Sequence, residues 1–165
     1  MLMNLTKKRA GKWAVGIAAG ICGLCVCGCF HDCPITEHPT RKVNEQFLGR
    51  WTSQDGKDKL TVGKYDAENY VVVYDGDLYH AWESDVDGVP FFSVQSLDPT
   101  QANGVYKYVY FVWRLAEDGT LRGRAVNDKI VPDATKGYAS VQRLLKTNLT
   151  RTDLLGDEGV FVKDK

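Results

Sequence analysis

The residues from Val105 to Leu115 read VYKYVYFVWRL, and their pattern is the most informative in the chain about its fold. Successive side chains of a β-strand point to opposite faces, and here both faces are apolar. One face carries Val109, Phe111, Trp113 and Leu115, and the other carries Tyr106, Tyr108, Tyr110 and Val112. A strand exposed on one side would show polar residues there. We therefore expect another element to cover the second face of this strand, or that face to line a cavity.

Further runs rich in Val, Tyr, Phe and Trp flank this stretch. They predict strands near residues 47–53, 58–64, 69–75, 78–84, 90–97 and 120–128, with a short last strand at 159–163. The central strand itself is expected over 105–115.

Four Asp-Gly pairs separate these runs, at residues 55–56, 75–76, 87–88 and 118–119. Asp-Gly suits tight hairpins because both residues tolerate a positive φ. Asp85, Asp87 and Gly88 also resemble part of a calcium loop, but the full ladder of oxygen ligands is absent, so we favour a turn. The chain is thus predicted to be an antiparallel meander, and pairing of its first and last strands would close it into a barrel.

A helix is expected over residues 136–149, KGYASVQRLLKTNL. At helical spacing its apolar residues form one stripe. That stripe consists of Tyr138, Val141, Leu144, Leu145 and Leu149. The helix is therefore one candidate to cover the second face of the central strand.

The beginning of the chain has a different character. Basic residues gather between Lys7 and Lys12, and the run from Trp13 to Gly28 carries no charge. This layout is typical of a secretory signal, and the run is short for a membrane span, which takes about 20 residues. An uncleaved anchor remains the alternative.

At the end of this run, Val26-Cys27-Gly28-Cys29 resembles the lipobox of bacterial lipoproteins. The resemblance implies a signal peptide over residues 1–28, cleavage after Gly28, a diacylglyceryl group on the Cys29 thiol and acylation of the new amino terminus. Several acyl chains give stable attachment to a membrane. The partner implied is thus a membrane of the cell envelope. Phe30 stands where Asp signals inner-membrane retention in enteric bacteria, which favours the outer membrane, facing the periplasm.

Cysteines in the leader allow a second interpretation, a soft-metal site. They form a CxxCxCxC pattern of Cys22, Cys25, Cys27 and Cys29, with Cys33 beyond it. Thiolate sites need polar groups that hydrogen-bond to the metal ligands, whereas this run is apolar and rich in glycine, so we favour the lipobox. After cleavage Cys33 has no partner within the chain for a disulfide, and its role stays open.

Residues 29–45 show no apolar periodicity and contain two prolines and scattered charges. They predict a lipidated, solvated tether that lifts a globular domain of residues 46–165 off the bilayer. His31, Cys33 and His38 are ligands that zinc or copper accepts, but gathering them on a flexible tether costs conformational entropy. We favour a spacer without a metal.

Phe47-Leu48-Gly49-Arg50-Trp51 resembles the F-x-G-x-W opening of the calycins, which include lipocalins and fatty-acid-binding proteins. The resemblance implies that this segment begins the first strand of a β-barrel, that Trp51 closes one end, and that the interior holds a hydrophobic ligand. The chain departs from these families in placing its helix before the last strand. The fold class expected is mainly β: a small antiparallel meander or barrel of about seven to eight strands with one C-terminal amphipathic helix, calycin-like.

Charge argues against nucleic acid as a partner. The chain has 21 Lys and Arg and 21 Asp and Glu, but four of the basic residues precede residue 13 and no acidic residue precedes Asp32. The remainder carries 17 basic against 21 acidic residues, a net charge of −4, whereas binding to phosphates requires a basic surplus.

Signatures of catalysis are scarce in the sequence. It contains neither a G-x-S-x-G elbow nor a G-x-x-x-x-G-K-[ST] loop, and His80 is the one histidine beyond residue 38. Arg122 and Arg124 alternate with small residues and either line an anionic pocket or face water; we favour water. We predict no catalytic residues, no metal and no cofactor.

The function expected is non-enzymatic binding by a lipid-anchored envelope protein, with an apolar small molecule or another envelope protein as partner. For a small molecule, the predicted lining is Tyr70, Tyr74, His80, Trp82, Tyr108 and Tyr110. The alternatives are a structural or assembly adaptor that contacts protein, and a hydrolase with an unrecognised site.

Overall fold

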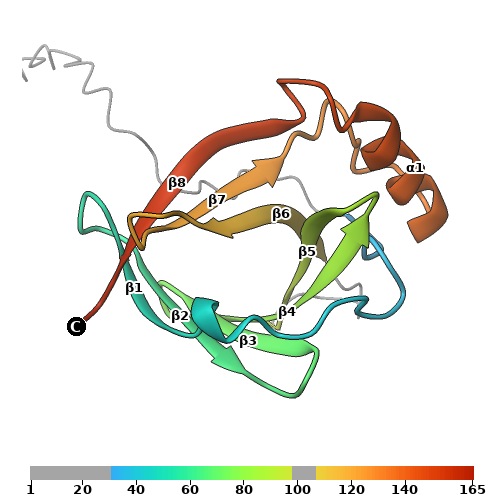
Figure 1. The fold of residues 1–165 in the computed structure, drawn as a ribbon. Coiled ribbons are helices and arrows are strands. Elements are labelled where there is room, and N and C mark those ends of the chain that lie inside the picture. The colour runs from blue at the N-terminus through green and yellow to red at the C-terminus, as the bar shows by residue number, and fades with distance from the viewer. Residues whose placement is uncertain (1–30, 98–106) are drawn as a thin grey trace, which may run out of the picture.

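The computed structural model of the protein describes residues 31–97 and 107–165. The predicted signal peptide, Cys29, and the positions 105–106 of the central stretch lie outside the described residues. Eight strands, one α-helix and one short 3-10 helix follow one another along the described chain (Figure 1). Their bounds are η1 Glu45–Phe47, β1 Gly49–Ser53, β2 Lys59–Lys64, β3 Asn69–Tyr74, β4 Asp77–Val86, β5 Val89–Ser96, β6 Tyr108–Leu115, β7 Leu121–Val126, α1 Tyr138–Asn148 and β8 Leu155–Lys163.

The strands form a closed antiparallel barrel in chain order. Each strand pairs with the next, and β8 closes the barrel on β1 through pairs such as Trp51 with Lys163 and Ser53 with Phe161. Closure leaves no strand edge unpaired along these ladders, which removes a common site of aggregation. The predicted fold class and the C-terminal helix are confirmed, and of the meander and the barrel that the sequence left open, the structure adopts the closed barrel. Strand β8 begins at Leu155, earlier than the predicted 159.

Two of the predicted hairpin turns have a positive φ at both central residues. Asp75 and Gly76 have φ of 49° and 97°, and Asp87 and Gly88 have φ of 51° and 85°. This is the backbone of a type I′ turn, whose twist matches that of the flanking strands. The carboxylate of Asp85 accepts a hydrogen bond from the backbone N–H of Gly88 at 2.7 Å, so the acidic residues there stabilise a turn.

Both faces of β6 are buried or half-buried from Tyr108 to Trp113, as its sequence predicts, and Arg114 beyond them is exposed. Phe111 belongs to a core cluster inside the barrel, together with Phe92, Leu121 and Phe161. Tyr108 and Tyr110 belong to a second cluster on the outside of the wall, which also contains Val141 and Leu145 of α1. The helix packs on this outer side of the wall and makes its main strand contacts with β4.

The chain before β1 also covers this outer face, and here the prediction of a solvated tether is wrong for the described residues. We call residues 31–44 the N-terminal strap. Its Ile35 is fully buried and His31 is 2% exposed. The His31 backbone N–H donates to the Tyr108 carbonyl at 2.8 Å, and the Tyr108 N–H donates to the His31 carbonyl at 2.9 Å.

Long-range hydrogen bonds fix the rest of the strap. The Ile35 N–H donates to Ser93 Oγ at 3.0 Å, Thr36 and Ser84 share a hydroxyl hydrogen bond of 2.5 Å, and the Thr40 N–H donates to the Glu83 carbonyl at 3.1 Å. The strap therefore runs along the outer wall of β4 and β5, where hydroxyl and carbonyl oxygens of these strands accept its hydrogen bonds. In the sequence these acceptors stand out only as isolated polar residues.

Over residues 31–97 and 107–165, no helix has the length and apolar character needed to cross a membrane.

Candidate functional site

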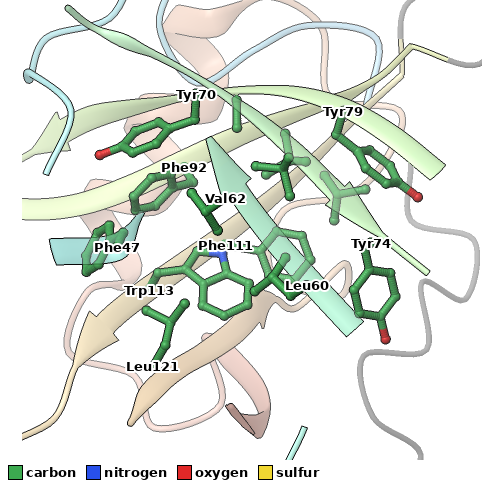
Figure 2. A pocket seen from close by; sticks show the side chains of 14 residues that line it. Phe47, Leu60, Val62, Tyr70, Tyr74, Tyr79, Phe92, Phe111, Trp113 and Leu121 are labelled. Atoms are coloured by element: carbon green, nitrogen blue, oxygen red, sulfur yellow. The ribbon is translucent and has the colours of Figure 1, made fainter. Parts of the chain in front are cut away.

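The interior of the barrel holds an apolar cavity of about 80 Å³ (Figure 2). Its walls come from β2 to β7 and from η1, and carbon atoms make up nearly all of its surface. The lining residues are Phe47, Leu60, Val62, Tyr70, Val72, Tyr74, Tyr79, Ala81, Phe92, Val94, Val109, Phe111, Trp113 and Leu121. Within each strand the lining residues are two positions apart, because alternate side chains of a pleated strand point to the same face, here the inner one.

One end of the cavity is closed by large side chains. Phe47, Tyr70 and Trp51 are 8%, 1% and 1% exposed there. The indole Nε1 of Trp51 donates to the Phe47 carbonyl at 2.9 Å, which fixes η1 under the barrel. The Tyr70 hydroxyl accepts a hydrogen bond from the Asn44 N–H at 2.7 Å, and burial raises the pKa of Tyr70 to about 12. This end is therefore a solid floor, where Trp51 lies as the calycin resemblance implies.

The other end is lined by Tyr74 and Tyr79, which are half-buried and whose hydroxyls point away from the cavity centre (Figure 2). These residues flank the turn between β3 and β4. Burial, followed by the charges of Asp58 and Asp75, raises the pKa of Tyr74 to about 12, so its hydroxyl stays neutral at physiological pH. We call this end the mouth, because its lining residues are partly accessible to solvent whereas the floor residues are not.

The side wall depends on a glycine. A Cβ built on Gly123 would lie 2.6 Å from Cζ3 of Trp113, closer than side chains approach one another. The two residues are register partners on β7 and β6. The indole therefore lies flat on the bare backbone of Gly123, which sets the width of the cavity on this side.

The structure brings together only part of the predicted ligand lining. Tyr70 and Tyr74 line the cavity, but His80, Trp82, Tyr108 and Tyr110 lie on the outer face of the wall, so their assignment to the lining is wrong. The physical reason is that β6 is apolar on both faces and β4 carries aromatic residues on both, Tyr79 on one and Trp82 on the other, so composition alone does not show which face is inside. The opposite set on the same strands, Tyr79, Ala81, Val109, Phe111 and Trp113, is the true lining.

Sequence reasoning also missed Leu60, Phe92 and Leu121, which line the cavity from the neighbouring strands. Register with β3 and β6 locates two of them, because Leu60 pairs with Tyr74 and Phe92 pairs with Phe111.

His80 has a structural environment. Its Nε2 lies 2.9 Å from Oδ1 of Asn69, and its ring lies 5.1 Å from that of Trp82 and 6.2 Å from that of Tyr65. An amide partner orients an imidazole but does not supply the nucleophile or the carboxylate of a hydrolytic triad. The described contacts of His80 therefore give no support to a hydrolase.

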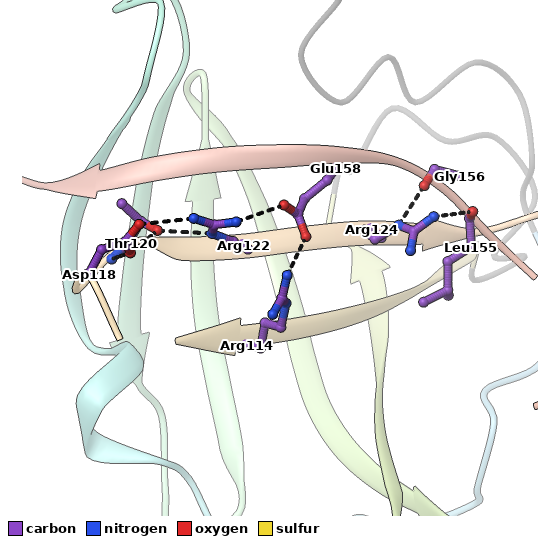
Figure 3. A network of polar contacts seen from close by, with 8 residues as sticks. All are labelled: Arg114, Asp118, Thr120, Arg122, Arg124, Leu155, Gly156 and Glu158. Atoms are coloured by element: carbon purple, nitrogen blue, oxygen red, sulfur yellow. Dashed lines mark hydrogen bonds and ion pairs between the residues drawn. The ribbon is translucent and has the colours of Figure 1, made fainter. Parts of the chain in front are cut away.

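The arginines of β6 and β7 form a charge ladder on the outside of the barrel (Figure 3). Glu158 on β8 accepts from Arg114 at 2.9 Å and from Arg122 at 3.3 Å, and Arg122 also pairs with Asp118 at 2.9 Å. The Arg114 guanidinium beside Glu158 lowers the pKa of this carboxyl. Arg124 donates to the carbonyls of Leu155 and Gly156 at 2.7 Å each. These contacts join three strands, and acidic side chains and backbone carbonyls of the chain itself accept from the guanidinium donors.

The strap histidine likewise has a packing role. The His31 ring stacks on Tyr110 with centroids 4.1 Å apart, and burial lowers its pKa against the opposing charges of Asp133, Asp128 and Asp32. Nowhere in residues 31–97 and 107–165 do three or more His, Cys, Asp or Glu side chains gather as a metal site.

Comparisons with protein-family models, with curated proteins and with solved structures found no match to this chain.

Proposed function

We propose that this chain is a lipid-anchored protein of the bacterial cell envelope whose barrel binds a small apolar molecule without transforming it. The observation that carries the binding role is the cavity itself, an apolar hollow with a solid floor and a partly accessible mouth inside a closed barrel. Sites for apolar ligands are concave and lined by hydrophobic and aromatic side chains. Support for the anchor comes from the lipobox-like residues Val26 to Cys29.

The volume of the cavity limits which molecules can enter it. Drug-sized ligands occupy pockets of about 300–1,000 Å³, and a dry protein cavity of about 150 Å³ binds benzene. At about 80 Å³ the cavity accepts a slender apolar group, such as the end of an alkyl chain, without rearrangement. A bulkier ligand requires Tyr74 and Tyr79 at the mouth to turn outward.

The same small volume favours a second candidate function. If the interior serves only as a core, the protein acts as a structural or assembly adaptor that contacts another envelope protein through its surface. The two functions differ in whether the cavity is occupied in the protein as it is isolated.

The ligand is tested by filling the cavity. Val94→Phe places a ring into the hollow from β5, whereas Val162→Phe makes the same chemical change on β8, where Val162 is 49% exposed. Each full-length protein is purified from its own membrane and extracted with organic solvent, and the extract is analysed by mass spectrometry. We expect an apolar compound with the wild type and Val162→Phe, and its loss with Val94→Phe when thermal melts show that the variant is folded. Identical extracts from all three would favour the adaptor.

The anchor is tested separately with Cys29→Ser. We expect the wild type to carry an added acyl mass and to partition into detergent, and the variant to lose both. Unchanged mass and partitioning would refute the lipobox interpretation.

A further inference from the structure

The strap enters the fold at the mouth end of the barrel. His31 pairs with Tyr108 at the beginning of β6, and Tyr108 is the register partner of Gln95 near the end of β5. The next residue of β5, Ser96, pairs with Tyr79 of the mouth. In an antiparallel meander the end of β5, the beginning of β6 and the turn between β3 and β4 lie at the same end, so His31 and the mouth are at one end of the molecule.

From His31 the strap runs away from the mouth. Thr40 donates to the Glu83 carbonyl, and the Val43 N–H donates to the Ala67 carbonyl, in the turn between β2 and β3, at 2.9 Å. That turn is at the floor end of the barrel. The strap therefore spans the barrel from mouth to floor, and His31, its first described residue, lies at the mouth end.

The distance from this point to the lipid-bearing residue is short. Cys29 precedes His31 by two positions, and an extended chain spans at most about 3.6 Å per residue, so the Cys29 Cα lies within about 7 Å of the His31 Cα. Because His31 is 2% exposed and bonded through both backbone groups, this short link begins at a fixed point. Ion pairs of Asp32 with Lys107, at 2.8 Å, and with Lys136 hold the same point.

Two of the exposed apolar side chains, Leu78 and Leu97, lie at the same end. Leu78 and Leu97 are 46% and 42% exposed, and they are neighbours, since the Leu97 N–H donates to the Leu78 carbonyl at 2.9 Å. Leu78 directly precedes Tyr79 of the mouth in β4, and Leu97 directly follows the last residue of β5. We call this pair the rim. Leucines beside tyrosine hydroxyls match the boundary between lipid headgroups and acyl chains, where apolar side chains insert and phenol groups stay hydrated.

We propose that the mouth end of the barrel rests on the bilayer that holds the Cys29 lipid, with the rim in contact with it, so that the cavity opens toward the membrane interface. This inference rests on the proposed lipid anchor. It also specifies the ligand class, an apolar molecule that reaches the cavity from the membrane rather than from water. Without the strap contacts, a flexible tether would allow every orientation of the domain.

The test places a tryptophan at either end of the barrel. Leu78→Trp and Leu97→Trp report on the rim, and Tyr65→Trp is the matched control, since Tyr65 is 73% exposed between β2 and β3 at the floor end. Full-length, lipidated variants are reconstituted into vesicles of phosphatidylethanolamine and phosphatidylglycerol, with and without bromine in the acyl chains. Bromine quenches tryptophan at close range, and the signal of the wild type is subtracted.

We expect the rim tryptophans to be quenched about twofold more than Trp at position 65, because rim side chains inserted at the interface reach the acyl boundary. Equal quenching at both ends, or stronger quenching at position 65, overturns the orientation. Mass spectrometry of the same samples separates the two proposals: a chain without acyl mass refutes the anchor and the orientation together, whereas an acylated chain with an unquenched rim refutes the orientation alone. If the rim is quenched but no apolar compound can be extracted from the protein, the binding function is refuted and the orientation stands.

Discussion

Ile35→Ala tests whether the strap is part of the folded domain. Ile35 is fully buried in the outer core cluster, with Trp82, Tyr110 and Leu145 among its members. Its backbone bond to Ser93 Oγ does not involve the side chain and survives the change. The substitution therefore removes apolar packing and little else.

The expected cost follows from the atoms removed. Ile→Ala deletes three buried carbons, at about 0.8 kcal/mol each for transfer to water, or roughly 2.4 kcal/mol. The unfilled space adds to this, so the loss falls within the range of about 2–5 kcal/mol seen for such core truncations. A solvated tether would give a loss near zero.

Urea unfolding of the full-length protein, followed by far-ultraviolet circular dichroism, measures the difference. Leu97→Ala is the control, because it removes the same number of carbons from a side chain that is 42% exposed. We expect the midpoint to fall clearly for Ile35→Ala and by less than half as much for Leu97→Ala. A change below about 0.5 kcal/mol for Ile35→Ala would place it among ordinary surface substitutions and refute the packed strap.

Three further changes probe the cavity wall and two buried ionisable groups. Gly123→Ala forces a Cβ against the Trp113 ring, so we expect a loss of about 1–3 kcal/mol in thermal or urea unfolding and a shift in tryptophan emission; unchanged emission would show that the ring does not lie on this backbone. Burial raises the pKa of Glu83 above 4.5, so the folded state holds that proton more tightly and stability falls as pH rises through the folded pKa. Glu83→Gln should therefore gain stability relative to the wild type between pH 4 and pH 7 in urea titrations, and a constant difference would contradict this. Burial lowers the pKa of His31 below 6.5, so the contribution of neutral His31 to stability is present above that value and is lost as pH falls through the folded pKa. The wild type should therefore lose more stability than His31→Phe between pH 7 and pH 5. Parallel losses in the two proteins would show that His31 does not titrate in this range.

The alternation of residues and the Asp-Gly pairs were sufficient to predict an antiparallel, mainly β fold, and they left open whether the meander closes into a barrel. Strands with two apolar faces require two layers of cover, and Asp75-Gly76 and Asp87-Gly88 adopt the hairpin geometry that their residue types favour. The helix over residues 138–148 follows from its stripe of Val141 and Leu145. The hairpin turns and the helix depend on residues that are close together in the chain, so their pattern can be recognised in the sequence.

The strap and the inner face of the wall lacked such a signal. Ile35 is a single apolar residue among polar ones, and its burial depends on Ser93, which is 58 residues away in sequence. Tyr110 and Phe111 are equally plausible core residues, and only closure of the barrel decides that Phe111 is inside and Tyr110 is under the strap. The candidate site was therefore predicted on the right strands, and for four of its six residues on the wrong face.

Native mass spectrometry of the intact protein, released from its own membrane, tests the central claim that the cavity binds an apolar molecule. We predict a chain that begins at Cys29 with its acyl groups and carries one further apolar molecule held without a covalent bond, which Val94→Phe fails to retain and Val162→Phe retains. An acylated wild-type chain with no additional mass, or with the same additional mass in Val94→Phe, would contradict the account.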